Sequence, residues 1–321
     1  MVIKLPPRVY DDLGEFLGKM KRPNNEPVIF DFEKVVKYSP VALVTLICKV
    51  KSYLFDDIPV FFINHERFAA CSYFQRMNFF SICDVSMPER FIRHESFGNF
   101  TVIQEFGLNK GSVDVISDGV ARCCIPEEEK WKIDHPLENS EIYDLLVYAI
   151  SELINNVVQH SEGRGFISAQ FYKQTELVRI GIADYGIGVL NSFKNNASPH
   201  FRENWNDADA VKKALEPKVS SKNHITSPYM TPVNAGVGLS ILKNLSEKLS
   251  GQFCLVSGNA IIENAQLKEL AADSYFKGVA INITFKKSGL LDFQEALMET
   301  KRDLGLITRT GKFKGVMGND D

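Results

Sequence analysis

The sequence lacks several features that would assign it to a well-marked class of protein. Its six cysteines include no C-x-x-C pair, and most lie among apolar neighbours, which is typical of free thiols in a reducing compartment. It has no excess of positive charge, because 37 Lys and Arg residues oppose 40 Asp and Glu residues, for a formal net charge of −3. Its longest apolar run, about residues 40–48, is too short to cross a bilayer. These absences argue against nucleic acid and membranes as partners and predict a cytoplasmic protein.

Length and composition allow two globular domains. The chain has 321 residues, of which 45% are hydrophobic and 24% charged, and single domains cluster near 100 to 200 residues. An acidic stretch near residues 127–130, followed by Pro136, is the preferred linker. We therefore predict a regulatory domain over residues 1–130, a larger domain over residues 131–290, and a helix with a polar tail over residues 291–321.

The N-terminal third alternates strands and helices. Residues 27–32 predict a strand, and Ser39-Pro40 then opens an apolar helix with Ser39 as N-cap and Pro40 at the first helical position. Residues 58–63 predict a second buried strand, and residues 67–80 have helical spacing again. This order is typical of an α/β layer with parallel strands. Residues 100–106 and 113–125 are expected to add two further strands.

The C-terminal part begins with the longest helical pattern in the chain, over residues 139–160. A long polar, loop-like segment with one short helix is expected in its middle. The remaining predicted elements are strands at 165–172, 177–183, 252–257 and 278–285, and helices at 207–215, after Gly238 and at 290–302. The predicted fold class is α/β, with a mixed sheet covered by helices.

Three polar residues occur every fourth position on the long helix. Glu152, Asn156 and His160 lie in one column along a single face, so a carboxylate, an amide and an imidazole can reach one volume. The alternative interpretation is a solvated flank beside the apolar stripe of the helix, with His160 favoured at the C-terminus by the helix dipole.

An aspartate and two glycines follow the second C-terminal strand. Asp184 ends an apolar strand and can accept a hydrogen bond from an exocyclic amine at the edge of the core. Gly186 and Gly188 allow a ligand to approach the backbone closely. The alternative is a tight turn held by an Asx-type hydrogen bond.

A second glycine-rich turn runs into a helix. Gly236, Gly238 and Leu239 form a G-x-G-L motif in which free backbone N–H groups and the helix dipole favour phosphate. The motif is not a Rossmann fingerprint, because no strand leads into it and Ile241 occupies the place of the third glycine. The chain also has no G-x-x-x-x-G-K-[ST] loop.

The order of these motifs resembles that of the GHKL superfamily of histidine-kinase-like, Bergerat-fold ATPases, over about residues 137–285. The resemblance implies binding of ATP with Mg²⁺. It makes Glu152 the acid that polarises water or an attacking hydroxyl, Asn156 the magnesium ligand, and Asp184 the acceptor of the adenine amine. The remaining cofactor-binding residues that it implies are His160, Gly186, Gly188, Lys222, Gly236, Gly238 and Leu239.

The resemblance has its own details and departures. An N-box helix that ends Asn-x-x-x-His, as here at His160, is frequent in the anti-sigma-factor kinase branch. Residues 191–233 would be an unusually long ATP lid. Val237 departs from the polar or small residue that many members carry at its place, and Gly278-Val279 stands where a glycine-threonine pair often contacts the base. The lid candidates for phosphate contact are Lys218, Ser220, Ser221 and Lys222.

The N-terminal domain is similar in element order to STAS domains of the anti-anti-sigma kind. In that family a serine at the start of the corresponding helix can accept phosphate, and the alternative for Ser39 is a plain N-cap. His65-Glu66-Arg67 has some likeness to the phosphoacceptor box of sensor kinases, but it follows a strand rather than lying in a long helical hairpin.

Two classes of function remain open at this point. One is a Mg-dependent serine/threonine kinase of the anti-sigma-factor type, acting on a protein partner such as a sigma-factor regulator, a STAS protein or an effector. The other is an ATP-dependent conformational switch or weak ATPase without kinase activity. In either class, a second copy of the chain is a further candidate partner, in a homodimer. A two-component sensor kinase is the third and least favoured alternative.

Overall fold

The computed structural model shows two lobes that pack against each other. The N-terminal lobe contains β1 (Val2–Lys4), β2 (Arg8–Val9), α1 (Leu13–Gly18), β3 (Val28–Asp31), β4 (Lys37–Tyr38), α2 (Pro40–Phe55), β5 (Val60–Ile63), α3 (Cys71–Arg76) and α4 (Phe79–Ile82). The structure describes residues 1–21, 23, 26–93, 99–107, 113–125, 141–160, 164–217, 219, 238–271, 273–292, 295, 298–299 and 302–303, without some side chains of the later helices.

The predicted strand and helix alternation of this lobe is confirmed. Strands β1, β3 and β5 form a parallel three-stranded sheet in the order β1-β3-β5. Ser39 is the N-cap of α2, as expected: its hydroxyl accepts from the Ala42 N–H and donates to the Tyr10 carbonyl. The expected helix over residues 67–80 is divided into α3 and α4, because Asn78 between them has a left-handed backbone with φ of 64°.

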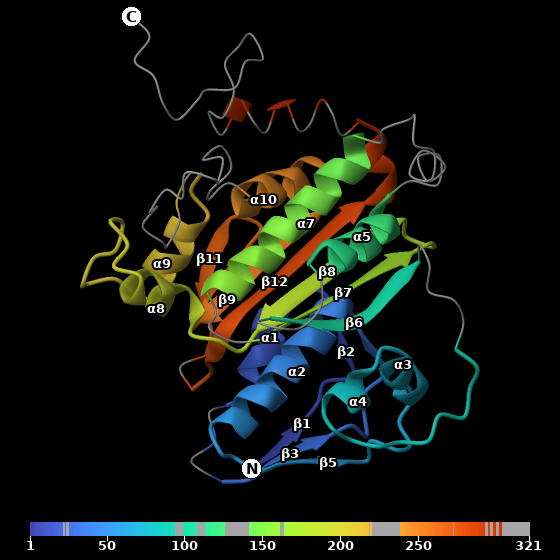
Figure 1. Ribbon diagram of the computed structural model, residues 1–321. Coiled ribbons are helices and arrows are strands. Elements are labelled where there is room, and N and C mark those ends of the chain that lie inside the picture. Colours follow the sequence, from blue (N-terminus) through green and yellow to red (C-terminus); the bar gives the residue numbers. More distant parts are fainter. Residues whose placement is uncertain are drawn as a thin grey trace, which may run out of the picture.

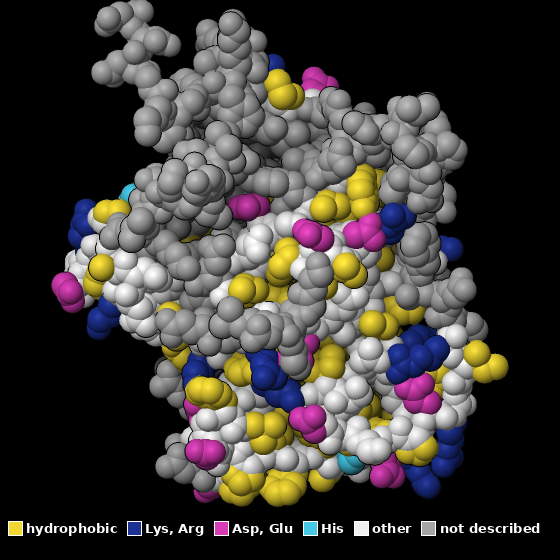
Figure 2. Space-filling view, viewed as in Figure 1, with side chains coloured by type: hydrophobic (Ala, Val, Ile, Leu, Met, Phe, Trp, Pro, Cys, Tyr) yellow, Lys and Arg dark blue, Asp and Glu magenta, His cyan; other side chains and the backbone are white. Residues whose placement is uncertain are grey.

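One face of the three-stranded sheet remains open to solvent. Val2, Ile29 and Phe61 are register partners and therefore share this outer face, where Val2 and Phe61 are each 55% exposed. Hydrophobic side chains accordingly gather at the lower edge of the molecule in Figure 2, where Figure 1 places these strands. The prediction of a buried strand at residues 58–63 is thus wrong for one face of β5, since its side chains alternate between the core and this outer face.

The second lobe is built on a seven-stranded sheet. Its strands are β6 (Phe100–Phe106), β7 (Gly165–Tyr172), β8 (Leu177–Asp184), β9 (Gln252–Gly258), β10 (Ala260–Glu263), β11 (Gln266–Glu269) and β12 (Phe276–Lys286). They lie in the order β11-β10-β9-β12-β8-β7-β6, and every neighbouring pair is antiparallel. Its helices are α5 (Val113–Cys124), α7 (Glu141–His160), α8 (Gly188–Asn195), α9 (Asp207–Ala214) and α10 (Gly238–Lys248), and the 3-10 helix η2 (Lys287–Asp292) follows β12.

The two faces of this sheet are covered by different parts of the chain (Figure 1). Helices α5, α7 and α10 cover one face, and Ile180 and Ile182 of β8 belong to the apolar core beneath them. The alternate residue Ala183 faces the other side, where it joins the core of the N-terminal lobe. Helix α2 lies on that side, so the larger sheet is sandwiched between its own helices and the smaller lobe.

Two elements N-terminal to residue 130 belong to the larger sheet. β6 pairs with β7, and α5 packs against α7. The prediction of a strand over residues 113–125 is wrong, because Ile116, Val120 and Cys124 recur every fourth residue and are buried on one face of a helix. The predicted linker itself, residues 127–136, lies outside the described residues, as does most of the predicted C-terminal helix and tail.

The two lobes contact each other through apolar packing, an ion pair and hydrogen bonds. Gly181 of β8 lies so close to α2 that a Cβ there would be 2.3 Å from the Val41 Cα. Asp11 receives the Arg179 guanidinium at 3.1 Å and also accepts from Asn282 and Thr284 of β12. In addition, the buried Lys49 ammonium donates to the Tyr275 carbonyl at 2.9 Å.

The fold is therefore mixed α/β, as predicted from the sequence at this level of detail. Among the described residues, no helix is both long and apolar enough to cross a membrane.

Candidate functional site

Strand directions bring the predicted site residues to one end of the large sheet. Asp184 ends β8 and is the register partner of Gly165, the first residue of β7, so the C-terminal end of α7, four residues before β7, lies near it. Val279 near the start of β12 pairs with Ser257 near the end of β9, at the same end of the sheet. The start of α10 lies at this end of the sheet too. The last turn of α10 leads directly into the first residues of β9, which lie at the opposite end of the sheet.

Apolar packing supports this convergence. Val189 near the start of α8 and Leu239 near the start of α10 pack against the same core cluster that contains Val157 of α7. Val279 of β12 packs against this cluster as well. The three motifs singled out in the sequence are thus anchored around one core rather than dispersed over the surface.

Asp184 is the buried charge of this region. Its side chain is 1% exposed, and its two oxygens accept from the backbone N–H of Gly186 at 2.8 Å and of Val279 at 3.2 Å. Burial raises the pKa of Asp184 to about 7, although both backbone hydrogen bonds act in the opposite direction. Each carboxylate oxygen retains a lone pair, so the group can still accept from a ligand.

Glycines line the backbone around this carboxylate. Gly278 has a φ of +96°, and a Cβ there would lie 2.2 Å from the Asp184 carbonyl oxygen and 2.7 Å from Oδ1. Gly188 has a φ of +78° and begins α8. Both positions therefore require glycine, and Gly186 contributes the N–H that fixes Asp184 Oδ1. The Asx-type hydrogen bond anticipated as the alternative for this turn is present, together with a second bond from β12.

The α7 residues are placed as their spacing predicts. Glu152 and Asn156 are both partly exposed, whereas Leu153, Ile154 and Val157 are buried in the core. Burial raises the pKa of the Glu152 carboxyl. His160 is the last residue of α7, and its side chain lies outside the described residues.

The phosphate-side motif is only partly described. Gly238 and Leu239 begin α10, as expected for a glycine-rich turn that runs into a helix. Gly236, Val237 and the lid candidates Lys218, Ser220, Ser221 and Lys222 lie outside the described residues.

The first part of the expected lid is a packed helical pair: α9 confirms the helix predicted at residues 207–215, whereas α8 corrects the prediction that the rest of this part is loop-like. α8 and α9 share a small core of Phe193, Ala210 and Val219, against which Phe201 and Trp205 pack. The missed signal was this recurrence of aromatic residues within a polar stretch. The pair is also tied to the sheet, because Asp207 accepts from the Asn259 N–H at 3.0 Å in the turn between β9 and β10.

Sequence patterns missed Ser257 as a residue of the site. It comes from β9, more than 70 residues after Asp184, and no local motif marks it. Gly278 of β12 was indicated by the family resemblance alone, through the Gly278-Val279 pair. The side chain of Val279 departs from the family pattern, but the group of Val279 that contacts Asp184 is its backbone N–H, which any non-proline residue would supply.

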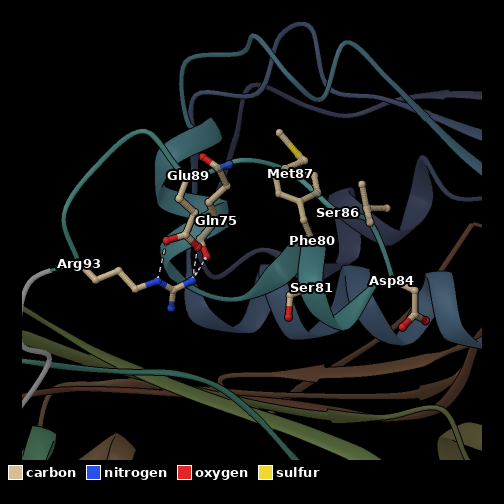
Figure 3. A pocket seen from close by; sticks show the side chains of 9 residues that line it. Gln75, Phe80, Ser81, Asp84, Ser86, Met87, Glu89 and Arg93 are labelled. Atoms are coloured by element: carbon tan, nitrogen blue, oxygen red, sulfur yellow. Dashed lines mark hydrogen bonds and ion pairs between the residues drawn. The ribbon is translucent and has the colours of Figure 1, made fainter.

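Two further features carry no ligand assignment. The described residues contain no cluster of three His, Cys, Asp or Glu side chains that could hold a metal ion. A hollow of about 410 Å³ lies beside α4 in the N-terminal lobe (Figure 3), and its charged residues are internally paired, Arg93 with Glu89 and Asp84 with Lys51.

His65 lies in the turn after β5 rather than in a helical hairpin.

No protein-family model matches this chain, and no curated protein matches it either. The candidate site therefore rests on the contacts of the residues described above.

Proposed function

We propose that the end of the large sheet binds ATP in a Bergerat-type pocket and that the N-terminal lobe is a STAS-like regulatory unit, in a cytoplasmic protein. The observation that carries the proposal is Asp184, a buried carboxylate between two glycines of positive φ, whose hydrogen-bond donors among the described residues are two backbone N–H groups. Such a group is suited to an uncharged donor such as the adenine amine.

The other motifs supply the phosphate side. The start of α10 offers backbone N–H groups and the positive end of a helix dipole to phosphate oxygens. Asn156, partly exposed toward the end of α7, offers an amide oxygen, and Mg²⁺ at nucleotide sites commonly takes one or two protein oxygens together with phosphates and water. When bound, the ion would neutralise part of the phosphate charge.

Glu152 is the proposed catalytic base. Its raised pKa brings a carboxylate closer to the range useful for accepting a proton near neutral pH. A serine or threonine hydroxyl of a partner protein attacks the γ-phosphorus, its proton passes to Glu152, and ADP leaves with the electrons of the broken bond. The alternative is a switch in which ATP changes a protein interface without transfer.

Ser39 is buried, with 0% exposure, and both hydrogen bonds of its hydroxyl are internal. These contacts support the N-cap interpretation of this residue. A phosphate on Ser39 would require the start of α2 to open away from β8.

The nucleotide proposal is tested by calorimetric titration of ATP into wild type and Asp184→Asn. We expect at least a tenfold loss of affinity, since the amide presents a donor to a site that needs only acceptors. Asp31→Asn is a matched control, because Asp31 also ends a buried strand and accepts from the N–H two residues on. Equal affinities for wild type and Asp184→Asn would contradict the assignment.

Turnover is tested separately with γ-labelled ATP and candidate partner proteins. Glu152→Gln should retain ATP affinity within about threefold and lose at least a hundredfold in phosphoryl transfer, the usual scale of general-base catalysis. Binding by wild type without released or transferred phosphate would favour the switch instead.

A further inference from the structure

The first turn of helix α8 receives no capping hydrogen bond from the side chain of its own N-cap residue. Its N-cap is Ile187, whose side chain cannot accept a hydrogen bond from the first turn. The N–H of Val189 instead donates to the hydroxyl of Ser257, at 2.9 Å, on strand β9. Ser257, 68 positions further along the chain than Val189, thus replaces the missing local cap.

The same hydroxyl holds the strand on its other side. Ser257 Oγ donates to the Gly278 carbonyl at 2.8 Å, and the next residue, Val279, donates its N–H to Asp184. Because a hydroxyl has one proton and two lone pairs, Ser257 can make both bonds at once. A continuous chain of hydrogen bonds therefore runs from Val189 through Ser257 and Gly278–Val279 to Asp184.

The space around Ser257 is closely defined. The side chain is 1% exposed, and a Cβ at Gly188 would lie 3.0 Å from its oxygen. The hydroxyl thus occupies the junction of two glycines, Gly188 and Gly278, whose backbones both have positive φ. Neither glycine has a Cβ that would set the distance between the start of α8 and β12. The Ser257 hydroxyl makes a hydrogen bond to each of these two segments.

We propose that Ser257 is a positioning residue of the nucleotide site, which fixes the direction of the Asp184 carboxylate by holding the start of α8 against β12. The inference rests on the proposed function, and Ser257 itself does not touch the nucleotide. Loss of its hydroxyl would leave a buried N–H and carbonyl unpaired and would loosen the Val279 N–H that aligns Asp184.

The first measurement is nucleotide affinity. Ser257→Ala should raise the Kd for ATP at least tenfold and should reduce the preference for ATP over GTP, because Asp184 reads the base. Ser257→Thr keeps the hydroxyl and should stay within about threefold of wild type. Ser168→Ala is the matched control, since Ser168 is 0% exposed on the same sheet and donates to the Thr101 carbonyl at 2.9 Å. Ser168→Ala should leave Kd unchanged.

The second measurement needs no nucleotide. The pKa of Asp184, followed by carboxyl NMR, should rise further in Ser257→Ala, because the Val279 N–H is one of the groups that lower it. Ser168→Ala should not move it. If wild type binds no ATP but Ser257→Ala shifts this pKa, the proposed function fails while the positioning role stands. If wild type binds ATP and Ser257→Ala changes neither quantity, the positioning role is overturned.

Discussion

The two faces of the seven-stranded sheet are held by different chemistry. Toward α5, α7 and α10 the contacts are largely apolar, with Leu153, Ile154 and Ile182 in one core. Toward the N-terminal lobe, apolar packing of α2 is joined by charged pairs and by a glycine contact at Gly181. A regular hydrophobic stripe is sufficient to attach a helix, whereas a whole lobe is oriented here by a few specific contacts.

The carboxylates on the two faces show the same contrast. Asp11, on the side of the N-terminal lobe, is paired with the Arg179 guanidinium. Asp184 lies at the end of β8 among backbone N–H donors and is fully buried. The paired carboxylate is suited to structure, and the one held by neutral donors can respond to a ligand.

The largest expected effect tests the glycine contact. Gly181→Val places side-chain atoms against the backbone of α2, so we expect the free energy of unfolding to fall by about 3 kcal/mol or more. The control is Gly119→Ala within α5, where the nearest atom to a new Cβ is 3.7 Å away and a small gain of about 0.5–1 kcal/mol is expected. Urea unfolding measures both, and similar values for the two variants would break the comparison.

The interlobe ion pair is expected to matter less than the glycine. Asp11→Ala should cost about 2–3 kcal/mol, because Arg179 keeps only 13% of its side chain exposed and loses its partner. Lys277→Gln breaks the exposed Lys277–Asp56 pair between the same lobes and should cost less than about 1 kcal/mol. A reversed order in chemical denaturation would mean that the rim, not the Asp11 cluster, orients the lobe.

The Asp184 carboxylate predicts a particular pH dependence. The folded protein keeps its proton up to about pH 7, whereas the unfolded chain releases it near 3.8, so the folded state binds more protons between these values. The contribution of Asp184 to the free energy of unfolding therefore falls as pH rises through this window, by up to about 1.4 kcal/mol per pH unit. Subtracting the curve of Asp184→Asn isolates this contribution, and a difference that rises with pH would be the wrong sign.

A smaller effect links this proton to the ligand. A donor from adenine favours the charged carboxylate, so ATP binding near pH 7 should release a fraction of a proton from Asp184. Titrations in two buffers of different ionisation enthalpy measure the release. Asp184→Asn should show less proton release than wild type.

Local patterns predicted the elements that carry their own signals. The Ser39-Pro40 start of α2 and the apolar strands β7 and β8 were found from sequence because capping and periodicity act over a few residues. Residues 113–125 misled the prediction, since their β-branched and cysteine residues suggested a strand while the four-residue burial spacing belongs to α5.

The candidate site was only partly predictable for a related reason. Asp184 and its glycines form a contiguous motif, and Glu152 and Asn156 share a helix face. Gly278, by contrast, is brought beside Asp184 by the pairing of β12 with β8, and Ser257 joins them through the pairing of β9 with β12. The hairpin of β10 and β11 is a local contact that the sequence patterns also did not indicate.

The place of β6 has a consequence for how this chain could be divided or recombined. A fragment that starts at residue 131 would leave β7 as a bare edge and remove α5 from beside α7. A fragment that starts near residue 99 would keep both, yet it would uncover the face of β8 on which α2 rests. Neither cut therefore separates the two lobes without exposing packed surface on one of them.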